Sequence, residues 1–317
     1  MVSFIIIGRN EGWKLTKCFQ SVIDTINYNK LENHEIIYVD SQSTDDSIER
    51  AKKFSEIKIF QIIGQCNAAI ARNIGAKESS GDTLFFIDGD MEILPEFLPL
   101  VFEEEKKLKY DFVSGQLIDH FYDVANNLLY KKNHISINKE QYKETTGGIF
   151  LINRELWDSV NGMKTKYRVN EDLDLGLRLS QKGTKLLRKI EVLAKHHTVS
   201  YKDSSRMWYN LFHGLEFYKV TLLRDHYNNL FFLKKFLREN YTSILLLFVI
   251  IASIKFANPQ FILIYLSVAL IRSGINMKKD VSRILSRFIY FALRDVSIWF
   301  AFFLFWPKGK NMGYRKI

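Results

Sequence analysis

The chain contains few cysteines, and their positions exclude two kinds of architecture. Only Cys18 and Cys66 occur among its 317 residues, and this pair provides neither a metal-binding spacing nor a disulfide framework. Cys18 falls on an apolar helical stripe, and Cys66 lies in a polar turn. We therefore expect a protein of a reducing compartment, long enough to bury a sizeable core.

The N-terminus lacks the features of a secretory signal peptide. Residues 1–7 are apolar, but Asn10, Glu11 and Lys14 follow at once. The apolar run is too short for a signal peptide and has no basic start. We expect a first β-strand there instead.

Excess positive charge is missing from the first 230 residues. The chain has 45 basic residues (Lys and Arg) and 35 acidic residues (Asp and Glu). Residues 231–317 contain 14 of the basic and 3 of the acidic residues, so residues 1–230 contain 31 basic and 32 acidic residues. A nucleic-acid-binding protein would place basic residues and exposed aromatics on its globular part, so we expect no nucleic-acid partner. The basic C-terminal part is also the most apolar, which points to anionic membrane lipids.

Strand-like and helix-like segments alternate over residues 1–110. The predicted strands are residues 2–7, 35–39, 58–63 and 83–87, and the predicted helices are residues 15–26 and 67–78. This alternation predicts βαβ units and an α/β fold with a mostly parallel sheet. Further strands are predicted over 112–114, 147–152 and 186–197, and a helix over 171–182. Residues 119–145 give no clear signal.

Two carboxylates follow the predicted strand 83–87, in the segment Asp88-Gly89-Asp90. Ligands of open α/β sheets gather outside the carboxyl ends of strands. Two carboxylates at this spacing can hold one divalent cation, which takes further oxygens from a substrate diphosphate. The alternative is a solvated turn, because Asp and Gly are favoured turn residues.

Two apolar runs, 241–257 and 259–275, predict a helical hairpin in the C-terminal part. Each just approaches the roughly 20 residues of a membrane-spanning helix. Basic residues flank both ends, which places both ends on the cytoplasmic side. Residues 288–306 contain Arg294 and Asp295, which are costly inside a bilayer, so an interfacial or re-entrant element is expected there. The alternative is that these runs are buried helices of a soluble core.

Several motifs in order resemble those of the family 2 glycosyltransferases, which have the GT-A fold. They are Arg9-Asn10-Glu11 after the first strand, the segment 39–46, Ala71-Arg72-Asn73-Ile74-Gly75, Asp88-Gly89-Asp90 and Glu171-Asp172. Ser41 and Gln42 depart from the commonest residues of the second motif. The resemblance covers about residues 1–200 and suggests a membrane-associated bacterial member. It implies a Rossmann-like, mostly parallel central sheet with flanking helices.

The resemblance implies a domain layout. Residues 1–229 would form the GT-A domain, with a nucleotide-binding half at 1–110 and an acceptor half at 111–229. Residues 230–317 would form a membrane-associated helical region.

The resemblance also implies donor-binding roles. Asp40 would lie near the nucleoside base, or alternatively cap a helix or turn. Arg72 would face the diphosphate or order Asp88, or form a surface ion pair. Asn10 and Glu11 would line the nucleotide pocket or cap the next helix.

The same resemblance implies the catalytic groups. Asp172 would be the base that takes the acceptor proton, with Glu171 as orienter; acids at a helix start for reasons of the helix dipole are the alternative. A single displacement implies inversion at the sugar carbon. Gly147 and Gly148 would admit the acceptor sugars closely, or simply bend a strand.

A divalent metal, Mn²⁺ or Mg²⁺, is the implied cofactor. Asp88 and Asp90 would bind it, with His197 as an additional ligand and His196 as its alternate. Asp88 would also approach the ribose of the donor and so belong to the nucleotide-sugar site. A packed or surface histidine is the competing interpretation.

Together these features predict an inverting, metal-dependent glycosyltransferase. It would move a sugar from a nucleotide-diphosphate sugar, with UDP-sugar favoured by the resemblance, to a hydroxyl of a lipid-linked saccharide or lipid. It would act at the cytoplasmic face of the cell membrane. One alternative is an inactive membrane-anchored sugar-binding or scaffold subunit. Another is a nucleotidyltransferase, although the long, glycine-rich basic loop of that class is missing after the first strand.

Overall fold

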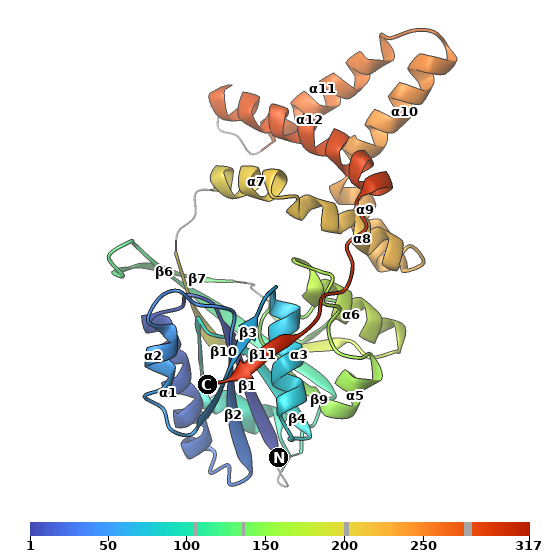
Figure 1. Cartoon of the computed structure of the whole chain (residues 1–317). Coiled ribbons are helices and arrows are strands. Elements are labelled where there is room, and N and C mark those ends of the chain that lie inside the picture. The colour runs from blue at the N-terminus through green and yellow to red at the C-terminus, as the bar shows by residue number, and fades with distance from the viewer. Residues whose placement is uncertain (104–106, 135–136, 200–202, 276–280) are drawn as a thin grey trace. The chain divides into compact units, whose positions relative to one another are not determined.

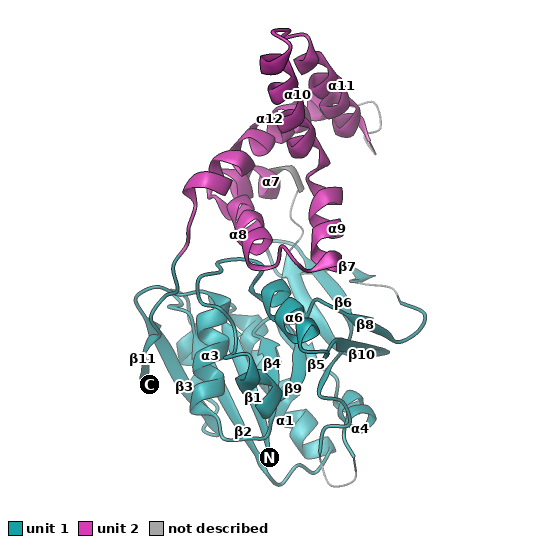
Figure 2. Cartoon of the chain, turned by 90° about the vertical axis from the view of Figure 1, so that its right-hand side faces the viewer, with its two compact units in different colours: residues 1–200, 308–317 teal, residues 201–307 magenta. Residues whose placement is uncertain are grey.

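The chain forms two compact units, coloured separately in Figure 2. The computed structural model describes residues 1–317 apart from 104–106, 135–136, 200–202 and 276–280. Unit 1 comprises residues 1–200 and 308–317, and unit 2 comprises residues 201–307. The expected boundary at 229 therefore lies inside unit 2, and the last ten residues belong to unit 1.

Unit 1 is built on one mixed sheet of strand order β11-β3-β2-β1-β4-β9-β6-β10-β5. Its first half is parallel, as predicted: β3 (Ile57–Ile63), β2 (His34–Asp40), β1 (Val2–Gly8) and β4 (Thr83–Asp88). Its second half is mixed. There β9 (Phe150–Asn153) runs antiparallel to β4 and to β6 (Phe112–Tyr122), β6 runs parallel to β10 (Leu186–Val199), and β5 (Met91–Ile93) closes that edge antiparallel.

Helices cover both faces of this sheet (Figure 1). Successive strand residues point to opposite faces, so every residue of an apolar strand such as β1 can be buried. Phe4 and Ile6 pack with α1 (Trp13–Tyr28) and α2 (Ser47–Ala51) on one face. Ile5 and Ile7 pack with α3 (Ala68–Glu78), α5 (Arg154–Ser159) and α6 (Glu171–Gln181) on the other. This explains why these strands are apolar runs rather than alternating patterns.

The stretch 119–145, which gave no clear signal, contains strands. The end of β6 pairs with β7 (Leu128–Asn133), and β8 (Gln141–Lys143) pairs with the start of β10. All six residues of β7 are exposed. A strand with no buried face needs no apolar alternation, so its sequence carries no periodic pattern.

The C-terminal tail returns to unit 1 after the helices of unit 2. Strand β11 (Gly313–Lys316) adds antiparallel to β3 at the sheet edge. Upstream, the backbone of Lys310 both donates to and accepts from the Thr165 hydroxyl, at 2.8 and 3.0 Å. The tail therefore holds the loop that contains Thr165 as well as the edge of the sheet.

Unit 2 is helical. Its helices are α7 (Asp203–Phe212), α8 (Tyr218–Asp225), α9 (Leu230–Glu239), α10 (Tyr241–Lys255), α11 (Phe261–Gly274) and α12 (Val281–Leu304). The predicted hairpin is present as α10 and α11. By length and composition, the described chain has no single helix that would cross a bilayer, whereas α9 and α10 qualify together as a pair bent by 73°.

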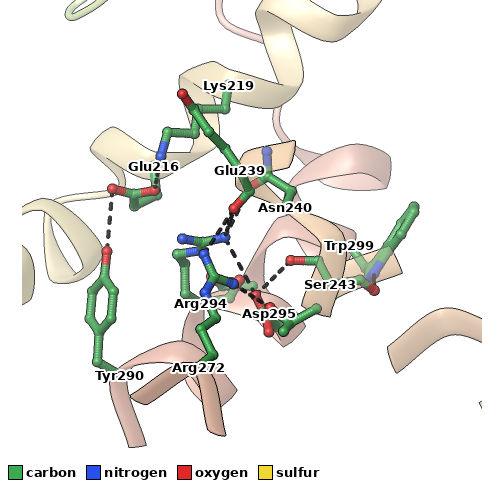
Figure 3. A network of polar contacts seen from close by, with 12 residues as sticks. Glu216, Lys219, Glu239, Asn240, Ser243, Arg272, Tyr290, Arg294, Asp295 and Trp299 are labelled. Carbon is green, nitrogen blue, oxygen red and sulfur yellow. Dashed lines mark hydrogen bonds and ion pairs between the residues drawn. The ribbon is translucent and has the colours of Figure 1, made fainter. Parts of the chain in front are cut away.

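A buried polar network lies at the bend between α9 and α10 (Figure 3). Arg272 and Arg294 both donate to the Glu239 carbonyl at 2.9 Å, and Arg294 also donates to Asn240 Oδ1 at 3.0 Å. Asp295 accepts from the Ser243 hydroxyl at 2.6 Å. The last carbonyls of a helix lack partners inside the helix and favour positive charge, so the two guanidinium groups stabilise the end of α9. The charges that interrupt the apolar run 288–306 are thus paired inside unit 2.

Candidate active site

A cleft of about 530 Å³ opens at the carboxyl ends of the parallel strands. We call it the candidate cleft. Nearly half of its lining residues were expected from the sequence to belong to the site: Glu11, Arg72, Asp88, Asp90, Gly147, Gly148, Glu171, Asp172 and the alternate His196. A larger hollow of about 860 Å³ lies near the amino ends of the same strands and contains none of these residues. The site of chemistry in such sheets is the carboxyl edge.

The end of β4 carries the two carboxylates into the cleft. Asp88 is the last residue of β4, and the Gly89 amide donates to the Ile7 carbonyl of β1 at 2.7 Å. A Cβ at position 89 would lie 3.1 Å from Leu15 and 3.2 Å from Glu11. Glycine between the two acids therefore lets the chain turn sharply beside β1, and both carboxylates remain at the cleft.

Arg72 of α3 contacts one acid of the pair Asp88 and Asp90 and one acid of the pair Glu171 and Asp172. Its guanidinium lies 2.6 Å from Asp88 Oδ1 and 3.4 Å from Glu171 Oε1, and it also donates to the Gly148 carbonyl at 3.2 Å. Burial alone would lower the pKa of Arg72, but the charges of Asp88 and Glu171 raise it. Arg72 therefore remains charged although it is only 2% exposed.

The acids around Arg72 are harder to ionise than usual. Burial raises the pKa of Asp88 to about 6 and that of Glu171 to about 7, although Arg72 opposes both shifts. Burial, and then the charge of Asp90, likewise raise the pKa of Glu11. Crowded carboxylates of this kind would be relieved by a cation among them.

Three residues of the motif 71–75 have separate structural tasks: Arg72, Asn73 and Gly75. Beside Arg72, Asn73 donates to the Met163 carbonyl at 2.8 Å and accepts from the Met163 amide at 2.9 Å. A Cβ on Gly75 would lie 2.2 Å from Ile5 Cγ2, so glycine lets α3 pack closely on β1. The motif thus places the Arg72 side chain at the cleft, holds the loop at Met163 through Asn73, and packs α3 against β1 through Gly75.

Gly147 and Gly148 line the cleft opposite Asp88. A Cβ on Gly148 would lie only 1.8 Å from Asp88 Oδ2, whereas one on Gly147 would lie 3.9 Å from its nearest neighbour. Gly147 instead has a φ of +77°, a conformation that favours glycine. A side chain at position 148 would therefore displace the Asp88 carboxylate.

Glu171 and Asp172 begin α6 directly after Asn170, which has a left-handed φ of 65°. Both acids line the candidate cleft. Glu171 is engaged by Arg72, and Asp172 is half-buried at the cleft. Glu171 is therefore held by an ion pair with Arg72, and the roles expected of the two acids stay predictions.

Asp40 and Asn10, which were expected to bind the donor, are not among the residues that line the candidate cleft. Asp40 is fully buried; its Oδ1 accepts from Tyr38, and its Oδ2 accepts from the Ser43 amide and from Gln61. Asn10 accepts from the Thr44 amide at 2.8 Å. Both residues hold the loop after β2, which corresponds to the turn alternative for Asp40, and Ser41 of that loop is the residue that reaches the cleft.

His197 also lies away from the cleft, and its expected role as a metal ligand does not fit this position. Its two ring nitrogens face Glu92 Oε2 at 3.0 Å and the Tyr122 hydroxyl at 2.9 Å. Burial lowers its pKa to about 4. Successive residues of a strand point to opposite faces, so the neighbour His196 faces the cleft instead, with Nε2 at 3.2 Å from Asp90 Oδ2.

The donor groups of the cleft fit a divalent cation. Asp88 and Asp90 provide carboxylate oxygens, and His196 provides an imidazole nitrogen, a set suited to Mn²⁺ and, through its oxygens, to Mg²⁺. Burial lowers the pKa of His196, but its bonds to Asp90 and Asp119 raise it overall to about 9. In the metal-free chain, the imidazolium is therefore the cation beside Asp90.

Several cleft residues were given no role in the sequence analysis, among them Arg9, Asn67 and Arg168. Asn67 caps α3 and donates to the carbonyls of Thr165 and Tyr167 at 2.9 and 3.0 Å. An asparagine at the start of a predicted helix is a capping signal that could have identified it. Arg168 lies in a loop without periodic pattern, and only the fold brings it to the cleft.

Comparison with known proteins establishes the family. Residues 3–165, just over half of the chain, match the model described as Glycosyl transferase family 2, and residues 131–202 match one described as the N-terminal domain of galactosyltransferase. The chain belongs to glycosyl transferase family 2, which confirms the resemblance found in the sequence.

The relatives of the chain are distant. It is 28% identical over 202 residues to a dolichol-phosphate mannosyltransferase of Pyrococcus furiosus, covering 62% of this chain and 54% of that one. It is 25% identical over 206 residues to a cholesterol galactosyltransferase of Borreliella burgdorferi, covering 58% and 56%. The chain thus spans about half the length of these relatives. The structure of S. aureus TarS 1-349 in complex with UDP aligns with a TM-score of 0.50 at 15% identity, covering 65% of this chain and 62% of that one. This likeness confirms the GT-A fold.

Proposed function

We propose that the chain is an inverting, metal-dependent glycosyltransferase. It moves a sugar from a nucleotide-diphosphate sugar to a hydroxyl of a lipid or lipid-linked saccharide at the cytoplasmic face of the cell membrane. The observation that carries this proposal is the convergence of Asp88, Asp90, Glu171 and Asp172 around Arg72 in one cleft. Family membership supplies the reaction class.

The donor would bind with its diphosphate at the acidic end of the cleft. Asp88, Asp90 and His196 would hold Mn²⁺ or Mg²⁺, which neutralises charge on the leaving diphosphate. Arg72 keeps Asp88 oriented at 2.6 Å. We favour a UDP-sugar, in keeping with the UDP bound to the similarly folded TarS.

Asp172 would accept the proton of the attacking hydroxyl. It lines the cleft at the start of α6, next to Glu171, which Arg72 holds. A carboxylate within hydrogen-bond reach of the hydroxyl lowers the barrier by accepting the proton as the new bond forms. One base and one displacement give inversion at the anomeric carbon.

Unit 2 supports a membrane acceptor. The hairpin exposes many large apolar side chains: Phe248, Ile250, Ile251, Ile254, Phe256, Leu263, Ile264, Leu266, Leu270 and Ile271. An apolar surface of this extent marks an interaction site, and the basic residues Lys234, Lys235 and Arg238 before it favour an anionic lipid surface. The expected basic residues Lys278 and Lys279 lie outside the described part of the chain. The names of the two relatives, which include dolichol phosphate and cholesterol, agree with a lipid acceptor.

The test is donor turnover by the purified chain with a panel of nucleotide sugars, Mn²⁺ or Mg²⁺, and membrane lipids. We expect Asp90→Asn and Asp172→Asn to lower kcat at least about 100-fold, since general-base catalysis alone contributes 10²–10⁴-fold. The exposed Asp158→Asn serves as a matched control with wild-type turnover. Equal turnover by all three variants would refute these roles. Release of pyrophosphate would support the nucleotidyltransferase, and donor binding without turnover would support the inactive subunit.

The membrane proposal is tested separately by flotation with liposomes of phosphatidylglycerol or phosphatidylcholine. We expect binding to the anionic vesicles and its loss in Ile254→Asn/Phe256→Ser, at the turn of the hairpin. The matched control is Val124→Asn, which changes a fully exposed apolar residue of unit 1. A hairpin variant that still floats as well as the control contradicts the proposal.

A further inference from the structure

Asp119 is a buried carboxylate for which the proposed mechanism has no role. It lies on β6, opposite His196 in the parallel pairing of β6 with β10. Only 8% of its surface is exposed. Its Oδ1 lies 2.8 Å from His196 Nδ1, and its Oδ2 lies 2.9 Å from His134 Nδ1. A carboxylate without bound cations at this depth needs hydrogen-bond donors, and the two imidazoles provide them.

The contact to Asp119 fixes which nitrogen of His196 carries hydrogen. An ionised carboxylate only accepts, so His196 Nδ1 must donate. The other nitrogen, Nε2, then points toward the cleft, 3.2 Å from Asp90 Oδ2. Bonds at both nitrogens hold the plane of the ring. A ligand for a metal beside Asp90 needs this orientation, with Nε2 free to lose its proton.

We infer that Asp119 is the positioning residue that presents His196 Nε2 to the metal held by Asp90. This inference rests on the proposed metal-dependent function. Metal-ligating histidines commonly donate their second N–H to a carboxylate, which fixes the ring and makes the ligand more basic. His134, whose side chain is 46% exposed, is the outer partner of Asp119 and is not required for this role.

The rival interpretation is that the Asp119, His134 and His196 cluster binds a cation itself, because their ligand atoms lie within 4.8 Å of one another. The contacts of 2.8 and 2.9 Å are ordinary N–H···O hydrogen bonds, which satisfies all three groups without a cation. Moreover, a cation on Nδ1 would remove the bond that orients Nε2 toward Asp90. The two interpretations differ in the number of metal ions bound per chain.

The experiment measures Mn²⁺ affinity and stoichiometry by electron paramagnetic resonance of free Mn²⁺, in the full chain with UDP. We expect one ion per chain and a 10- to 100-fold higher Kd in Asp119→Ala, the usual cost of losing such a partner. Asp119→Asn keeps one acceptor oxygen, so its Mn²⁺ Kd should lie between those of wild type and Asp119→Ala. The Kd of His134→Gln should stay within about threefold of wild type, because His134 contacts only the outer side of Asp119. The control Glu35→Gln removes a buried, hydrogen-bonded carboxylate remote from the cleft and should leave the Kd unchanged.

A double-mutant cycle separates positioning from a merely structural effect. If Asp119 acts through His196, Asp119→Ala should have no further effect on the Mn²⁺ Kd in a His196→Ala background. Nitrogen-15 spectra of the metal-free chain should show the Nδ1 proton of His196 in wild type and its loss in Asp119→Ala. If Asp119→Ala does not fold, the cycle is run with Asp119→Asn. The inference would be overturned by an unchanged Mn²⁺ Kd in Asp119→Ala, by additive effects of Asp119→Ala and His196→Ala, or by a second bound ion that is lost with Asp119. If these variants change the Mn²⁺ Kd as expected but the wild-type chain turns over no donor, only the proposed function is overturned.

Discussion

The substitution Gly148→Ala tests the candidate cleft most directly. The added Cβ would lie 1.8 Å from Asp88 Oδ2, and real Cβ atoms essentially never approach closer than 3.0 Å. The carboxylate and the backbone must therefore separate by at least 1.2 Å. We expect this displacement to break the 2.6 Å bond from Arg72 to Asp88 Oδ1. A hydrogen bond between charged groups contributes about 1.5–3 kcal/mol, which corresponds to roughly 10- to 150-fold in a binding constant.

We accordingly expect Gly148→Ala to weaken UDP binding in the presence of Mn²⁺ by about 10- to 150-fold, measured by isothermal titration calorimetry. The neighbouring Gly147→Ala is the matched control, because its Cβ meets nothing closer than 3.9 Å. Its φ of +77° instead costs about 1–2 kcal/mol of folding free energy. Gly148→Ala should therefore lose UDP affinity, whereas Gly147→Ala should lose thermal stability. Equal UDP affinity in Gly148→Ala and wild type would refute the reasoning.

Three further perturbations test the structure around the cleft. Bonds from Lys58, Ser80 and Ser3 outweigh burial and lower the pKa of Glu35 from 4.5 to about 2. Glu35→Gln should therefore cost about 2 kcal/mol of unfolding free energy at pH 7, a difference that fades as the pH falls from 4.5 toward 2; urea unfolding at both pH values measures it. Arg72→Met leaves two partly buried carboxylates without their cation and should cost about 1–3 kcal/mol at pH 8. The deficit should shrink at pH 5, where those carboxylates take up protons, and a pH-independent deficit would contradict the assignment. Deleting residues 308–317 should speed hydrogen exchange in the loop at Thr165, as seen by mass spectrometry, and unchanged exchange there would show that the tail does not hold the loop.

The parallel half of the sheet could be predicted because its strands are buried on both faces and alternate with amphipathic helices. The predicted strand 83–87 and helix 67–78 match β4 and α3 within one residue or so. The antiparallel half was harder to predict. Strand β7 has no buried face, and β8 has only three residues, so neither produces an apolar pattern. The tail strand β11 follows a whole helical unit, and no local signal links it to β3.

The sequence by itself determined the acidic residues of the candidate site and their order along the chain, because carboxylates directly after apolar strands are recognisable without coordinates. The tertiary structure alone decided which neighbour of each pair faces the cleft. A strand turns successive side chains to opposite faces, so His196 meets Asp90 while His197 is buried against Tyr122. The same holds for Arg72, whose link to Asp88 and Glu171 depends on packing between segments almost 100 residues apart. Motif spacing reports what is near along the chain, whereas the contacts of a site depend on what the fold brings together in space.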